Sequence, residues 1–197
     1  MRRCQPSLLF TQHWEVSQVR RWTLLLATGF LAAIAAVALV VPTASAVTSC
    51  PVGWGSLEKQ APGMSVAPIV GVRAGQQDCY DRLVFDIAGR APGYDVKYVS
   101  QVLGEASGLP VNVPGGARLA IVLRSPAYNA QGQSTIGRMP NVSGFQTFRS
   151  VVYAGSFEGQ TTIGLGVRAR LPFRVFVLPG PGTGSRVVVD VADRWTA

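Results

Sequence analysis

The feature that most constrains this chain is a pair of predicted strands within residues 153–179. From residue 163 to 171 every second side chain is apolar, and the positions between hold two glycines and two arginines: Gly164, Gly166, Arg168 and Arg170. A period of two is typical of a strand with one buried and one exposed face. After Pro172, the run FRVFVL is rich in β-branched and aromatic residues and predicts a second strand. Any function is expected near the side that carries the glycines and arginines.

The remainder of the chain beyond residue 68 has the same character. Short apolar or alternating runs are separated by turns rich in Gly, Pro and Asn, and none has a long helical period. Further strands are predicted at residues 69–72, 80–87, 94–99, 109–113, 117–123, 145–153 and 185–191, with the longest loop at 125–144. Short strands at this spacing indicate an all-β domain, a small antiparallel β-sandwich, with a small barrel as the alternative.

The N-terminus resembles a secretory signal peptide. Arg20 and Arg21 precede an uncharged apolar run at residues 23–41, and small residues follow Pro42. A positive segment, an apolar segment and an Ala-x-Ala end predict cleavage between Ala46 and Val47. The alternative is a retained anchor, because the run is long enough to cross a bilayer; only in that case do we expect membrane contact. The predicted organisation is a signal peptide with an N-terminal extension (1–46), an irregular arm (47–67) and a domain (68–197).

Two cysteines, Cys50 and Cys79, remain after the predicted cleavage site, since Cys4 precedes it. Paired cysteines are common in exported proteins, so we expect a disulfide that ties the arm to the first strong strand. Two free thiols are the alternative.

The chemistry that the sequence lacks limits its function. The only histidine, His13, lies before the predicted cleavage site, so we expect no Ser–His triad and no histidine-based zinc site. No cofactor or metal is expected. The formal net charge is +8, and +5 remains after residue 46 because four arginines and one glutamate precede Val47. The arginines are scattered, with no basic run, so nucleic acid is not an expected partner.

Recognition therefore remains as the expected activity. A flat strip at Gly164 and Gly166, flanked by Arg168 and Arg170, could receive an acidic polymer because guanidinium groups pair well with carboxylate and phosphate. Two more residues are added as candidates at neighbouring positions: Arg82 and Glu158. The alternative is structural, in which the arginines form ion pairs with Asp81, Asp86, Glu158 or Asp190 on neighbouring strands.

Several motifs resemble one known family. The segments CYDRLVFD (79–86) and PGYDVKYV (92–99) are similar to the CYDRVVFD…PGYxVxYV pattern of actinobacterial AMIN-like domain proteins. GGAxL (115–119), Phe148-Arg149 and AGSFEG (154–159) fit the same group, so the resemblance covers residues 68–192. It implies a secreted β-sandwich and, by analogy with AMIN domains, targeting to the cell wall with peptidoglycan as ligand. The lipoprotein cysteine of many relatives is missing here, and no catalytic residue carries over.

We therefore expect an exported, non-enzymatic domain in the cell envelope that binds peptidoglycan or an associated anionic glycan. One alternative is a module that binds another exported protein, through an open sheet edge. A second alternative is an envelope hydrolase that uses a carboxylate pair such as Asp81 with Asp86 or Glu158.

Overall fold

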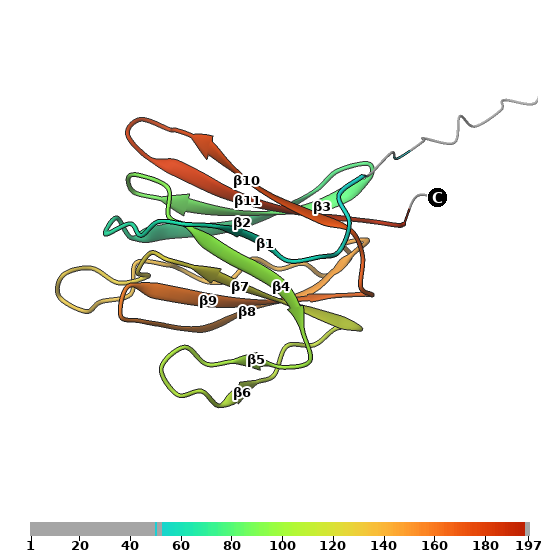
Figure 1. The fold of residues 1–197 in the computed structure, drawn as a ribbon, viewed down its shortest axis with the longest axis horizontal. Helices are drawn as coiled ribbons and strands as arrows, with labels where there is room; N and C mark the ends of the chain where they lie inside the picture. Colours follow the sequence, from blue (N-terminus) through green and yellow to red (C-terminus); the bar gives the residue numbers. More distant parts are fainter. Residues whose placement is uncertain (1–49, 51–52, 196–197) are drawn as a thin grey trace, which may run out of the picture. The chain divides into compact units, whose positions relative to one another are not determined.

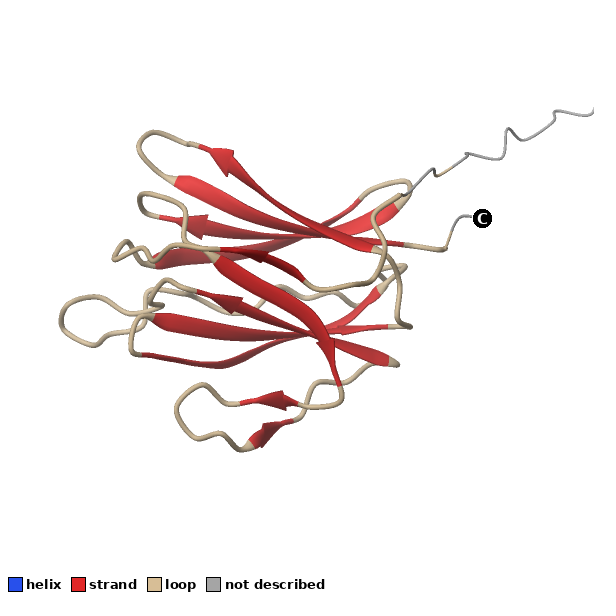
Figure 2. Ribbon diagram, in the orientation of Figure 1, coloured by secondary structure: helices blue, strands red, loops and turns tan. Residues whose placement is uncertain are grey.

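Two antiparallel β-sheets and one small hairpin make up the computed structural model, which describes residues 50 and 53–195 (Figures 1 and 2). The order of strands is β10-β11-β3-β2 in one sheet and β1-β4-β7-β9-β8 in the other. The predicted all-β sandwich is thus confirmed. The strands are β1 (Lys59–Ala61), β2 (Ile69–Gln76), β3 (Tyr80–Ile87), β4 (Tyr94–Val99), β5 (Val102–Leu103), β6 (Pro110–Val111), β7 (Ala117–Leu123), β8 (Phe148–Phe157), β9 (Gln160–Val167), β10 (Phe173–Pro179) and β11 (Ser185–Ala192).

The predicted signal peptide, with cleavage between Ala46 and Val47, lies outside the described residues. Within the part of the chain that the structure describes, no helix has the length and apolar character needed to cross a bilayer.

The core lies between the two sheets. Strand β3 alternates strictly, with Leu83, Phe85 and Ile87 buried and the residues between them partly exposed. This alternation places one face of the strand on the core and the other toward solvent. Phe148 and Phe173 complete the core from β8 and β10 and are fully buried. Burial of this apolar surface is the main driving force for the fold.

The five-stranded sheet is covered on its outer face as well, which corrects one expectation. In β9, Gly164 and Gly166 are buried and not exposed. A Cβ atom on Gly164 would lie 2.5 Å from Val113 Cγ2, and one on Gly166 would lie 1.8 Å from the carbonyl oxygen of Pro114. The β5–β6 hairpin and the turn after it therefore form a third layer, visible below the sheet in Figure 1. The glycines are required because neighbouring segments approach the strand closely.

The N-terminal arm is more ordered than expected. Its residues 59–61 form edge strand β1, which pairs with β4. Cys50 and Cys79 form a disulfide across 29 residues, which confirms the predicted pairing. The carbonyl of Gly55 accepts a hydrogen bond of 2.9 Å from the amide of Phe173. The arm is therefore attached to the start of β3 and to the edge of β10.

A buried carboxylate fixes the point where the long 124–147 loop enters β8. Asp81 accepts hydrogen bonds of 2.7 and 2.8 Å from the amides of Thr147 and Phe148. Arg82, its neighbour, points to the opposite face of β3 and pairs elsewhere. The two residues are thus not partners of each other.

Candidate functional site

Each strand of the four-stranded sheet carries one arginine on its solvent side. The register places Arg174 opposite Asp190, and Asp190 opposite Arg82, across β10, β11 and β3. Arg73 and Arg186 lie farther along the same face, on β2 and β11. Trp54, Tyr80 and Phe176 contribute aromatic rings to it. We call this surface the arginine face and define it by its residues: Trp54, Arg73, Tyr80, Arg82, Asp86, Arg174, Phe176, Arg186 and Asp190.

Asp190 is the centre of one half of the arginine face. Its carboxylate is fully buried and pairs with Arg82 at 2.7 Å and with Arg174 at 2.8 Å. A buried carboxylate between two guanidinium groups fixes the orientation of both. Hydrogen bonding to Asp190 raises the pKa of Arg82 above its ordinary value, so this arginine keeps its charge throughout the physiological pH range.

Aromatic rings form cation–π contacts with the guanidinium groups of Arg82 and Arg174. The Arg174 guanidinium lies 4.3 Å from the ring centroid of Trp54 and 5.0 Å from that of Phe176. Tyr80 contacts Trp54 edge to face at 5.6 Å and lies 5.3 Å from the Arg82 guanidinium. Cation–π contacts of this kind are electrostatically favourable. They produce a surface on which flat apolar and cationic groups alternate.

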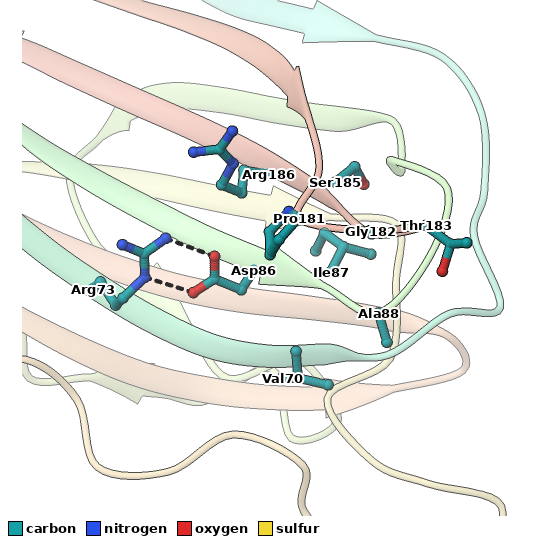
Figure 3. A pocket seen from close by; sticks show the side chains of 11 residues that line it. Val70, Arg73, Asp86, Ile87, Ala88, Pro181, Gly182, Thr183, Ser185 and Arg186 are labelled. Carbon is teal, nitrogen blue, oxygen red and sulfur yellow. Dashed lines mark hydrogen bonds and ion pairs between the residues drawn. The ribbon is translucent and has the colours of Figure 1, made fainter.

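The other half of the arginine face contains a hollow of about 570 Å³ beside the β10–β11 turn (Figure 3). Arg73 donates two hydrogen bonds of 2.7 Å to Asp86, in a bidentate pair that Figure 3 shows. Arg186 donates to the carbonyls of Pro179 and Gly180 and has no carboxylate within 4.0 Å among the described residues. Val70 and Pro181 supply apolar wall. A guanidinium with unused donors beside apolar wall suits a ligand with a carboxylate or phosphate group.

The charge of the arginine face is positive. Four arginines stand against Asp86 and Asp190, which leaves a formal charge of +2. The bidentate hydrogen bonds to Asp86 raise the pKa of Arg73, so this charge also persists at neutral pH. An anionic polymer would therefore be attracted to this surface.

Most of the residues predicted as a site lie elsewhere. The predicted exposed glycine strip is wrong, because the β5–β6 layer covers Gly164 and Gly166. Strand β9 ends at Val167, so Arg168 and Arg170 follow it in the turn. Arg168 donates to the carbonyl of Asp193, and Arg170 contacts Ser56 and the ring of Tyr98. Neither arginine forms the ion pairs that the structural alternative predicted.

The other two predicted residues, Glu158 and Arg82, lie on different sheets of the sandwich. Glu158 is exposed in the β8–β9 turn, with a φ of 48°. Arg82 is the one predicted candidate on the arginine face. Sequence reasoning missed Arg73, Arg174 and Arg186, although each is the single charged residue of a mainly apolar run: IVGVRAG, FRVFVL and SRVVV. That pattern is the signal that would have identified them.

The carboxylates proposed for a hydrolase do not meet in one cleft. Asp81 is buried and caps β8, whereas Asp86 points to the opposite side of β3. Glu158 belongs to the other sheet. Ser156 Oγ donates to the carbonyl of Gln160 and accepts from the amide of Ala127, which gives it a structural role. Among residues 50 and 53–195, no three His, Cys, Asp or Glu side chains are grouped as metal ligands would be.

The sheet edges are partly occupied. On β10, the amide of Phe173 bonds to Gly55 and the carbonyl of Val175 accepts from the Tyr94 hydroxyl. Pro179 ends that strand and has no amide hydrogen to donate. The pairing of β8 is interrupted by two irregularities. Such edges are poor templates for an added strand.

Two comparisons with known proteins bear on these surfaces. The family model described as the AMIN-like domain matches residues 67–193, which include every strand except β1 and every residue of the arginine face except Trp54. A search of the curated proteins finds no match.

Proposed function

Because the chain belongs to the AMIN-like domain family, we propose that it is an exported, non-enzymatic domain that binds a polymer of the cell envelope through the arginine face. The family is extracytoplasmic and is generally associated with peptidoglycan binding. The disulfide between Cys50 and Cys79 agrees with an oxidising compartment outside the cytoplasm.

One observation carries the choice of surface. The β5–β6 layer covers much of the outer face of the five-stranded sheet, whereas the outer face of the four-stranded sheet presents four arginines and three aromatic rings side by side. Pre-oriented guanidinium groups lose little entropy when they bind a ligand.

The proposed ligand is peptidoglycan or an anionic glycan attached to it. Guanidinium groups bind carboxylate and phosphate in a bidentate manner, and aromatic rings offer flat apolar area. Asp190 and Arg186 lie four residues apart on β11. At about 3.3 Å per residue along a strand, they are roughly 13 Å apart. A polymer with repeated charged groups could contact both.

Sedimentation of the purified protein with isolated cell-wall sacculi, before and after removal of attached anionic polymers, tests this proposal. We expect Arg73→Gln with Arg186→Gln to weaken binding about tenfold. The fold should be unaffected, because neither arginine contacts the core. The matched control is Arg90→Gln with Arg138→Gln, which removes the same charge from two exposed arginines whose side chains make no hydrogen bond or ion pair with any residue that the structure describes. Equal binding by the two double variants would overturn the assignment of the arginine face.

The same experiment separates the alternatives. Loss of binding only after removal of anionic polymers would identify those polymers as the ligand. Absence of binding to either preparation would favour an exported protein as the partner. Release of soluble wall fragments that Glu158→Gln abolishes would favour the hydrolase; the separation of the carboxylates argues against it.

A further inference from the structure

A polar groove beside the five-stranded sheet is separate from the arginine face, and we propose that it binds an oxyanion, a phosphate or a carboxylate group. Two adjoining hollows of about 340 and 360 Å³ share Ser100 and Arg118 in their walls. They lie where β4 ends and the β5–β6 hairpin begins. This inference does not rest on the proposed function of the arginine face.

Arg118 supplies the first binding group. It lies on β7 opposite Gly166, so its side chain projects from the outer face of the sheet. Its Nε donates a hydrogen bond of 3.0 Å to the carbonyl of Val113, which holds the guanidinium in place. Its two terminal nitrogens have no hydrogen-bond partner among the described residues. They form the planar fork that suits two oxygens of one anion.

Arg170 supplies the second binding group and lines the same hollow as Arg118. Its Nε and one terminal nitrogen contact Ser56 at 3.2 and 3.3 Å, and the guanidinium lies 5.1 Å from the centroid of the Tyr98 ring. These contacts fix the side chain but do not neutralise its charge. The other terminal nitrogen has no hydrogen-bond partner in the described part of the chain.

Among the described residues, those that line the groove include no Asp or Glu. Besides the two arginines, the polar side chains in the walls are those of Tyr98, Ser100, Gln101 and Asn112. By contrast, the hollow in Figure 3 includes Asp86, and another hollow beside the hairpin includes Glu105. Two like charges at one hollow repel each other unless an anion lies between them. Nearby amide and hydroxyl groups can complete the hydrogen bonds of such an anion.

The geometry of the groove depends on close packing beneath it. A Cβ on Gly116 would lie 2.1 Å from the carbonyl oxygen of Arg168. The turn before β7 and the segment that leads to Arg170 are therefore in direct contact, which brings the two arginines, 52 residues apart in sequence (118 and 170), to one hollow. The close backbone contact at Gly116 therefore fixes the positions of the two segments that carry Arg118 and Arg170.

Amide chemical shifts of the purified protein, followed while inorganic phosphate or acetate is added at constant ionic strength, test the proposal. We expect saturable shifts at Ser100, Gln101 and Arg118. Arg118→Gln and Arg170→Gln should each weaken the affinity about three- to tenfold, because each removes one charge-assisted contact at a partly exposed site. Arg118→Lys keeps the charge but loses the fork, so we expect an intermediate loss.

The control variant is Arg90→Gln, which removes one positive charge from an exposed side chain that has no partner within residues 50 and 53–195, and it should leave the affinity unchanged. Tighter binding of phosphate would point to a phosphodiester polymer, and tighter binding of acetate to a carboxylate-bearing chain; both support the site. Shifts that do not saturate, or that persist unchanged in a folded Arg118→Gln, Arg170→Gln variant, would overturn it.

Discussion

The carboxylate of Asp190 is fully buried and accepts hydrogen bonds of 2.7 and 2.9 Å from the guanidinium of Arg82 on the adjacent strand. Its side chain also accepts from Arg174, at 2.9 Å. One buried charge thus orients two of the four arginines of the arginine face. Loss of that carboxylate would leave two guanidinium groups facing each other.

We expect Asp190→Asn to lower the free energy of unfolding by about 2–3 kcal/mol, because it leaves partly buried charges without compensation. Urea denaturation measures this change. Asp86→Asn is the matched control: the side chains of Asp86 and Arg73 are 25% and 60% exposed, so its loss should cost under about 1 kcal/mol. Equal losses in the two variants would mean that burial does not govern these pairs.

Reduction of the disulfide between Cys50 and Cys79 should destabilise the domain. The bridge closes a loop across 29 residues, and the chain-entropy account assigns such a loop about 3–4 kcal/mol. Trp54 lies four residues beyond Cys50 and contacts Tyr80, so its near-ultraviolet circular dichroism should weaken at the same time. A reduced protein with unchanged stability and an unchanged tryptophan signal would contradict this.

Gly166→Ala tests the third layer. A Cβ there would lie 1.8 Å from the carbonyl oxygen of Pro114 and 2.4 Å from Ser150 Oγ, so the turn before β7 must move. We expect a loss of about 1–3 kcal/mol or more in the free energy of unfolding. Gly137→Ala is the control, since a Cβ at that position meets nothing within 4 Å. A neutral Gly166→Ala would show that the β5–β6 layer is not held against β9.

Asp193 should give the domain a pH-dependent stability. Burial raises its pKa above the ordinary value, and the charge of Asp81 raises it further, while the hydrogen bond from Thr147 and the charge of Arg168 lower it. The folded state therefore binds the proton more tightly than the unfolded state. The contribution of Asp193 to stability is largest below its unfolded pKa and falls as pH rises through its folded pKa.

Asp193→Asn removes this titration and should keep an acceptor for Thr147. As the pH rises from below the ordinary aspartate pKa of 3.8, the free energy of unfolding of the variant should increase relative to that of the parent protein. Urea denaturation at a series of pH values measures it. Parallel pH curves for the two proteins would contradict the assigned pKa direction.

Much of the fold could be predicted because strand alternation is local. The run YDRLVFDI was expected as a strand, and β3 covers the same residues, 80–87. The disulfide also followed from cysteine count alone. In contrast, β1 was missed, because three residues of edge strand have no periodicity to detect.

The candidate site was harder to predict because it depends on contacts between distant segments. The alternation around Gly164 predicted a strand with one open face. Nothing in the local sequence shows that Val113 and Pro114 pack against that face. The pairing of Arg82 with Asp190 spans 108 residues. Only the tertiary register of β3 with β11 brings these two residues together.

That register has a consequence for the order of assembly. Strand β3 lies between β2, its immediate neighbour in sequence, and β11, which ends at Ala192. During synthesis, β3 therefore keeps an unpaired edge until β11 has emerged. Such long-range closure slows folding and leaves a strand exposed to other chains in the interval. Chains truncated before residue 185 should consequently aggregate and fail to fold as a smaller sandwich.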